Sequence, residues 1–127
     1  DPPPRRIAMQ QIAAAAGLAA LTPSHLCVHP AYGPWIALRA VIVADLDGPA
    51  VTPRATPPCD CAAADGCGAA FAAALALGAP SGADELRTRW RRWLAVRDAC
   101  PVGRDHRYGD DQLRYHYTGD RAALPRP

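Results

Sequence analysis

Four cysteines offer the most reactive chemistry in this sequence. Three of them stand within nine residues of one another and the fourth follows in the last third of the chain: Cys59, Cys61, Cys67 and Cys100. Four thiolates can hold an iron–sulfur cluster or a tetrahedral zinc ion, so we treat these residues as candidate metal ligands. In the bacterial iron–sulfur run the last ligand position would fall on Phe71, which cannot bind iron. A redox-active pair and ordinary unpaired thiols therefore stay open as alternatives.

A second candidate site lies in the turn at residues 29–34 and just after it. Its residues are His29, Tyr32, Gly33 and Trp35. Gly33 would let the backbone approach a flat ligand closely, and the two aromatic rings would offer stacking surfaces. The alternative is a packed β-turn in which His29 only makes a hydrogen bond.

A third candidate site is rich in arginine. All 14 basic residues are Arg, and half of them fall between Arg87 and Arg107. Three of these, Arg97, Arg104 and Arg107, would form a phosphate or carboxylate site near a helix end. Its aromatic wall would consist of His106, Tyr108, Tyr115, His116 and Tyr117. The alternative is a solvated helix face, since neighbouring Asp and Glu residues nearly balance the charge.

Three segments have the composition of helices and would position these groups. The chain is Ala-rich over residues 6–21 and again over residues 62–77, and Ala favours the helix. Residues 84–99 begin with two acids, which suit the helix dipole, and place Trp and Leu at helical spacing. We expect all three to be helices, with Gly17 weakening the middle of the first. Residues 112–117 predict a short helix or an extended arm.

Two segments have the pattern of strands. Residues 26–28 form a short one, with Cys27 expected as a small core residue. Residues 35–44 are apolar on both faces apart from Arg39, so this run predicts a central strand that is buried on both sides. The intervening turn favours a hairpin between the two strands, although a wider connection stays open.

Length, charge and composition exclude several classes of protein. Residues 1–127 have room for a single domain, or for the C-terminal portion of a larger one, with loose ends at residues 1–5 and 119–127. A net charge of +2 is too small to indicate a nucleic-acid partner. No apolar run reaches the roughly 18 residues of a membrane span. Five cysteines without an export signal indicate a reducing, cytoplasmic compartment. Because the chain starts with Asp1 rather than Met, we expect a fragment, a processed form or a domain.

Two stretches carry a recognisable pattern, HPAYGPWIALRA at residues 29–40 and WRRWLAVRDACPVGRDHRYGDDQLRYH at residues 90–116. Together they resemble a corrinoid-linked reductase superfamily. Its members include cobalamin-processing decyanases, epoxyqueuosine reductases and bacterial ferredoxin-like proteins. Residues 29–40 read HPAYGPWIALRA and are similar to its His-Pro-x-Tyr/Phe-Gly-x-Trp-x-x-x-Arg motif. Residues 90–98, WRRWLAVRD, and 107–112, RYGDDQ, resemble decyanase segments. Residues 97–104, RDACPVGR, followed by the QLRYH of residues 112–116, resemble the ferredoxin-like group. The resemblance spans roughly residues 7–118 and is to the C-terminal half of such proteins.

The resemblance implies an α+β, nitroreductase-like fold with an antiparallel sheet flanked by helices, here as an incomplete half. It implies a cytoplasmic oxidoreductase that delivers electrons to, or binds, a corrinoid. Cobalamin or flavin would lie at His29, Tyr32, Gly33 and Trp35, and Arg97 would match an arginine associated with a thiol cosubstrate. The partners would be an electron-donor protein or that cosubstrate, together with a second copy of the chain or a missing N-terminal half. The alternative is a non-catalytic binding or interaction domain without a cofactor.

Overall fold

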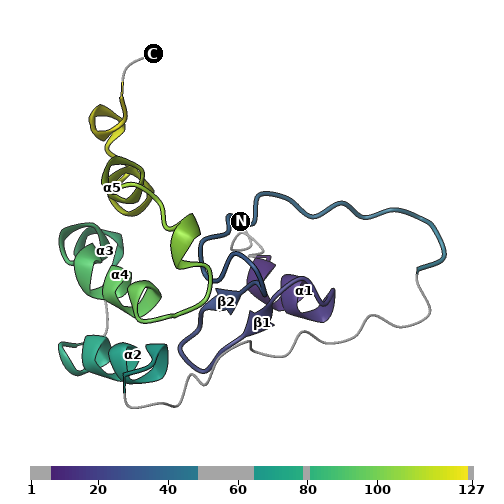
Figure 1. Cartoon of the computed structure of the whole chain (residues 1–127). Coiled ribbons are helices and arrows are strands. Elements are labelled where there is room, and N and C mark those ends of the chain that lie inside the picture. The colour runs from purple at the N-terminus through teal and green to yellow at the C-terminus, as the bar shows by residue number, and fades with distance from the viewer. Residues whose placement is uncertain (1–6, 49–64, 79–80, 126–127) are drawn as a thin grey trace.

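The protein combines helices with a small antiparallel sheet, and so belongs to the α+β class that the sequence predicts (Figure 1). The computed structural model describes residues 7–48, 65–78 and 81–125. In chain order the elements are α1 (Met9–Ala15), β1 (Ala20–Leu21), β2 (Cys27–Val28), α2 (Cys67–Ala76), α3 (Ala83–Thr88), α4 (Trp90–Asp98), η1 (Arg104–His106), α5 (Asp110–Thr118) and η2 (Arg121–Ala123). The N-terminal elements, α1, β1 and β2, lie on one side of the molecule, and helices α2 to α5 lie stacked on the other.

Helix α1 is shorter than the expected helix over residues 6–21. It ends at Ala15 because Gly17 adopts a left-handed conformation with a φ of 70°. The amides of Gly17 and Leu18 then donate to the carbonyls of Ala14 and Ala13, which satisfies the last carbonyls of the helix. Gly17 therefore terminates the helix rather than weakening its middle.

The sheet is a two-stranded hairpin with an unexpected partner. Strand β2 confirms the predicted strand over residues 26–28, but it pairs with β1, in the register Ala20↔Val28 and Leu21↔Cys27. The turn between them is closed by Thr22, whose hydroxyl and amide both donate to the Leu26 carbonyl. The expected hairpin between residues 26–28 and 35–44 is therefore wrong. Strand β1 was not predicted because the small residues before Thr22 show no strand pattern in the sequence.

Residues 35–44 do not form the predicted central strand. They run without regular secondary structure, and only their first part is packed: Trp35 is buried and Ile36 and Leu38 contact the cluster of Ala13, Ala19 and Cys27. Farther along, Ile42 and Val43 are each 91% exposed. Strands need a neighbour for their hydrogen bonds. Apart from the Trp35 amide, which donates to the Tyr32 carbonyl in the preceding turn, the described residues make no backbone hydrogen bond with this segment.

The helical half follows the sequence more closely. Helix α2 lies within the expected 62–77 segment, of which residues 62–64 lie outside the described residues. The helix expected over residues 84–99 forms as two, α3 and α4, separated at Arg89, where φ is −113° and ψ is 24°. Helix α5 covers residues 112–117, so the helical alternative is the correct one for that arm.

Three small apolar clusters hold these elements together. One joins α2 to α4 through Cys67, Ala74 and Val96. A second joins α1 to the hairpin through Ala13, Ala19 and Cys27, which confirms Cys27 as a core residue. The third, Trp35, Leu94 and Leu113, joins the N-terminal half to α4 and α5. This last cluster is what brings the two halves of the molecule together beside the candidate site.

Candidate functional site

The turn after β2 is organised by His29. Its backbone exchanges two hydrogen bonds with Gly33, both 2.9 Å long. Its ring nitrogen Nδ1 accepts from the amides of Ala31 and Tyr32 at 3.1 and 3.2 Å, and the ring stacks on Tyr32. His29 therefore holds the turn together by hydrogen bonds. This is the packed turn that the sequence left open as the alternative to a ligand-binding site.

Gly33 is the point where this turn meets the loop after α4. It has a φ of +58°, and a Cβ placed there would lie 1.9 Å from the carbonyl oxygen of Val102. Gly103 approaches the Tyr32 backbone in the same way, and the half-exposed Tyr32 ring meets His106 edge-on at 4.7 Å. The close approach that Gly33 allows is thus made by the protein's own backbone.

Arg97 links the two segments from inside the molecule. It is 7% exposed, and its Nη2 donates to the carbonyl oxygen of Pro34 at 2.6 Å. Its guanidinium lies 4.4 Å from the centre of the Trp35 ring and 5.4 Å from that of Tyr108. The described residues offer it no carboxylate within salt-bridge distance. A buried guanidinium that makes a carbonyl hydrogen bond and ring contacts keeps an uncompensated positive charge.

A cleft of about 390 Å³, here called the central cleft, lies between the N-terminal half and α5. The guanidiniums of Arg39 and Arg97 and the imidazole of His116 line it. The apolar part of its wall includes the side chains of Met9, Leu26, Ile36 and Leu38. Within the described part of the chain no Asp or Glu lines it. The charged side chains on its wall are thus guanidiniums, and the other polar side chains, among them Gln10 and Tyr117, are neutral, which is compatible with an anion site.

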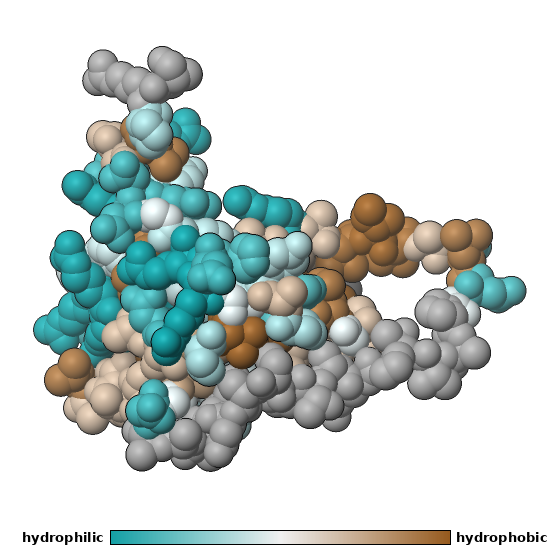
Figure 2. All heavy atoms as spheres, in the orientation of Figure 1, coloured by the Kyte–Doolittle hydropathy of each residue, from teal (hydrophilic) through white to brown (hydrophobic). Residues whose placement is uncertain are grey.

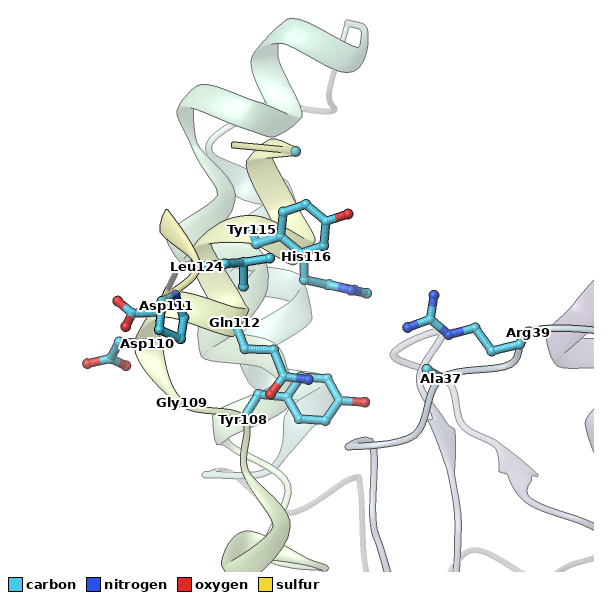
Figure 3. A pocket seen from close by; sticks show the side chains of 12 residues that line it. Ala37, Arg39, Tyr108, Gly109, Asp110, Asp111, Gln112, Tyr115, His116 and Leu124 are labelled. Carbon is cyan, nitrogen blue, oxygen red and sulfur yellow. The ribbon is translucent and has the colours of Figure 1, made fainter. Parts of the chain in front are cut away.

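A second cleft, of about 780 Å³, opens beside the first and shares Ala37, Arg39 and His116 with it. We call it the outer cleft. In Figure 3 the His116 imidazole from α5 and the Arg39 guanidinium from the opposite segment point toward one another across it, with the Tyr108 hydroxyl nearby. Asp110 and Asp111 also line this cleft, but their carboxylates point away from Arg39 in the same view. The two clefts thus meet where a guanidinium faces an imidazole.

The electrostatics of His116 reflect this setting. Burial lowers the pKa of His116 below its ordinary value of 6.5, and the positive charges of Arg97 and Arg39 lower that pKa further. At neutral pH the imidazole is therefore mostly uncharged. An anion placed between these groups would offset the two guanidinium charges and draw a proton onto His116.

Cys27 also lines the central cleft, but as an unreactive thiol. Burial raises the pKa of Cys27 above its ordinary value of 9.0. The thiolate is the nucleophilic form of cysteine, and little of it exists at neutral pH at such a site. Cys27 therefore serves the wall of the cleft and the core.

Of the arginines expected to act with Arg97, Arg107 does lie near it, with its guanidinium 5.8 Å from the centre of the same Trp35 ring, but its charge is engaged in ion pairs. Arg107 pairs with Asp98 at 2.8 Å and with Asp110 at 3.3 Å, and these contacts raise its pKa. Arg104 is exposed in η1, and neither residue lines the central cleft. The set of Arg97, Arg104 and Arg107 was thus the wrong grouping, because ion pairing takes up the charge of Arg107. Of the expected aromatic wall, His116 and Tyr117 do line the central cleft.

The cysteine set is only partly described. Cys59 and Cys61 lie outside the described residues. Cys67 and Cys100 are both buried, and Cys67 accepts a hydrogen bond from the Ser24 hydroxyl at 3.2 Å. Within residues 7–48, 65–78 and 81–125 no group of three or more His, Cys, Asp or Glu side chains could hold a metal ion.

Sequence reasoning missed Arg39 as a site residue. The signal was present, since Arg39 is the single charged residue in the apolar run over residues 35–44. We interpreted the run as a buried strand, in which Arg39 was only an exception to the pattern. Its partner His116, 77 positions later, could not be linked to it without the fold.

Comparison with protein-family models, with curated proteins and with solved structures finds no match to this chain. Among its described helices, none combines the length and the apolar character that crossing a membrane requires.

Proposed function

We propose that this chain is a binding domain for an anionic small molecule, held in the central cleft by Arg39, Arg97 and His116. The observation that carries the proposal is the charge of the cleft: two guanidiniums and an imidazole face it, and the described residues put no carboxylate on its wall. The ligand class is an organic carboxylate or phosphate with an apolar part. That class suits the apolar remainder of the wall, which includes Ile36 and Leu38.

The three groups have different parts in binding. Arg97 is held in place by Pro34 and Trp35, so it presents a fixed positive charge. Arg39 is exposed on the opposite segment and closes the ligand from the solvent side. His116 takes up a proton as the anion binds, because the anion reverses the local charge that lowers its pKa.

Calorimetric titration with inorganic phosphate, pyrophosphate and citrate tests this proposal. We expect binding that weakens with added salt and strengthens as the pH is lowered, with proton uptake that depends on the ionisation enthalpy of the buffer. Arg39→Ala should weaken binding about tenfold or more, as loss of one charge-assisted hydrogen bond does. Arg104→Ala is the matched control, because Arg104 is an exposed arginine that does not line the central cleft.

Equal loss of affinity in both variants would show that binding follows the overall charge of the protein and would contradict a specific site. Absence of heat with all three anions at low salt would contradict the proposal itself. A neutral polyol such as glycerol is the ligand control.

A second candidate function is the redox role implied by the resemblance to the corrinoid-linked reductases. In that proposal a nitroreductase-like half-domain in the cytoplasm exchanges electrons between a donor protein or thiol cosubstrate and a corrinoid or flavin. The observation that favours it is the direct packing of the two resembling stretches, by Arg97 on Pro34 and Trp35 and by Gly33 on Val102. His29, Tyr32, Gly33, Trp35 and Arg97 would bind the cofactor or cosubstrate, and Cys59, Cys61, Cys67 and Cys100 would hold a cluster or react as thiols.

Two spectroscopic experiments test the redox role. One is anaerobic reconstitution with iron and sulfide, in which a cluster would give thiolate-to-iron charge-transfer absorption that Cys67→Ala abolishes. The other is titration with cobalamin, in which binding would shift the corrinoid spectrum. No charge-transfer absorption together with no cobalamin shift would contradict the redox role, while leaving the anion titration unaffected.

A further inference from the structure

The segment after Ile36 is extended, apolar and unpaired. In Figure 1 it leaves the body of the molecule, and in Figure 2 the hydrophobic colour follows the same projecting arm. Val41, Ile42, Val43 and Leu46 are exposed there, three of them by more than four fifths of their surface. The described residues make no hydrogen bond to the backbone of residues 36–48. Such a segment is an open template for a further strand.

The sequence of this segment keeps every strand hydrogen bond available. The chain holds 14 prolines, and none falls between Pro34 and Pro49. Proline removes a ladder donor and is one means by which proteins protect exposed edges from pairing. The β-branched Val and Ile of this segment favour the pleated, half-buried environment of a sheet over that of a solvated linker.

We propose that residues 38–46 pair with the same segment of a second copy of this chain, antiparallel and centred on Ile42. In this register Ile42 faces Ile42 of the second copy, Val41 faces Val43, Ala40 faces Ala44, and Leu38 faces Leu46. Arg39 then lies opposite Asp45 of the second copy, and by the two-fold symmetry this pair occurs twice. Every apolar side chain meets an apolar one and every charge meets its opposite.

Other pairings of two copies do not have this complementarity. A parallel pair in register would set Arg39 beside Arg39 and Asp45 beside Asp45, and like charges directly opposite one another destabilise a sheet. Moving the antiparallel centre to Val41 places Arg39 against Val43. Moving it to Val43 pairs Arg39 with Asp47 but places Val41 against Asp45. The distribution of charge therefore selects both the direction and the register.

The pairing leaves the central cleft functional. Arg39 lines that cleft and would also face Asp45 of the second copy. A guanidinium has five N–H donors, which are enough for one carboxylate across the strand pair and one anion in the cleft. The two proposals share Arg39 but are read out separately, because Ile42→Lys tests the dimer at a residue that does not line the cleft, and the anion titration of that variant tests the cleft without the dimer.

Sedimentation and light scattering over a range of protein concentrations test the pairing. We expect a monomer–dimer equilibrium for the unmodified chain. Ile42→Lys should give a monomer at every concentration at which the unmodified chain is a dimer, because it sets two like charges face to face at the symmetry axis. Leu77→Lys is the matched control: Leu77 is also an exposed apolar side chain, 66% exposed at the end of α2, and its replacement should leave the dimer intact.

A charge exchange tests the register. Asp45→Arg alone should raise the dimer dissociation constant about tenfold, since both symmetric pairs change from attraction to repulsion. The double variant Arg39→Asp with Asp45→Arg should restore the original value. Far-UV circular dichroism checks that each variant folds, which we expect because these side chains are exposed.

Three outcomes would overturn the proposal. The first is an unmodified chain that stays monomeric, even where it captures a different polypeptide through this segment. The second is a dimer that persists in Ile42→Lys, since it would use another surface. The third is a double charge exchange that fails to restore what the single variant loses.

Discussion

The two halves of the molecule treat their apolar side chains differently. In the N-terminal half, residues 7–48, large apolar side chains are exposed before and on α1, on the hairpin and on the extended segment, for example Ile7 at 64% and Ile42 at 91%. In the helical half the described large apolar side chains that are exposed are Leu75 and Leu77, at 41% and 66%, and Tyr115 and Leu124, at 36% each. Residues 81–125 thus bury their large apolar side chains more fully than the N-terminal half does, and α2 stands between the two.

The difference follows from where each element finds its hydrogen bonds. A helix pairs its backbone groups within four residues, so α2, α4 and α5 satisfy most of their backbone hydrogen bonds internally and need neighbours only to bury their side chains. A strand pairs only with another strand, so residues 35–44 depend on a partner that the described chain does not provide. Strong β propensity is therefore not enough to form a strand, and residues 35–44 stay extended and unpaired.

The polar surfaces of the two halves differ as well. The helical half carries ion pairs along and between its elements, including Arg92–Glu85 at 3.1 Å, Arg107–Asp98 at 2.8 Å and Arg114–Asp120 at 3.0 Å. The salt bridges among the described residues all lie between residues 84 and 120. Arg39 and Arg97, the arginines of the cleft, take part in none of them. The one buried arginine of the described chain, Arg97, thus lies where the halves meet and forms no ion pair with a described residue.

The largest expected effect is the difference in unfolding free energy between two truncations of a large apolar side chain to Ala, one in each half. Leu113→Ala removes a fully buried side chain from the cluster with Trp35 and Leu94 and should lower the free energy of unfolding by about 2–5 kcal/mol. Ile42→Ala is the counterpart and should change it by less than about 0.5 kcal/mol. Urea denaturation, at concentrations that keep the chain monomeric, measures both. Equal losses would show that residues 35–44 are packed and would remove the contrast.

A smaller but still large effect is expected at the junction of the halves. Gly33→Ala places a Cβ against the Val102 carbonyl at a left-handed φ, so it should cost at least about 2 kcal/mol of stability. Gly48→Ala, at the end of the extended segment, meets nothing within 4 Å and should be close to neutral. The thermal unfolding midpoints of the two variants, each compared with that of the unmodified chain, measure this difference in stability. A Gly33→Ala protein as stable as the Gly48→Ala protein would show that the turn does not rest on the loop after α4.

The smallest effect concerns His116, which faces Arg97 of α4 and Arg39 of the extended segment and contacts the rings of Tyr108 and Tyr117. Its pKa is lower in the folded than in the unfolded chain, so the unfolded chain binds more protons below pH 6.5. Stability should therefore be unaffected by this group above that value and should fall as the pH decreases below it.

The variant His116→Gln separates this contribution from that of the carboxylates. The difference in unfolding free energy between the variant and the unmodified chain should be constant above pH 6.5 and should shift in favour of the variant at lower pH. A difference that stays constant across the whole range would contradict the lowered pKa. Arg39→Ala should reduce the shift, because it removes one of the two charges that cause it.

Local sequence signals predicted the positions of most helices. Ala content predicted α1 and α2, and the acids at Asp84 and Glu85 marked the start of α3. The break at Arg89 carried no such signal, because neither Gly nor Pro stands there. Gly17 was visible in the sequence, but whether a glycine interrupts or ends a helix depends on where the chain goes next. In the structure the chain turns there toward β1.

The candidate site was less accessible to sequence reasoning. Arg97 was singled out from its position and its resemblance, and the structure places it at the centre of the contacts between the halves. Arg107 was grouped with it by proximity in the sequence, yet Asp98 at the end of α4 and Asp110 at the start of α5 pair with Arg107. Arg39 and His116 became a pair only through the fold, since nothing in the sequence relates two residues of separate segments.

By itself the sequence determined the α+β class, the helices and the chemical nature of each candidate group, because helix formation and ionisation depend on neighbouring residues and side-chain type. Tertiary structure alone decided which strand partner β2 has, that residues 35–44 stay unpaired, and that Arg39, Arg97 and His116 face one cleft. Those features rest on contacts between distant parts of the chain. Their free energy comes from burial and from charges brought together in space, which no local pattern of residues records.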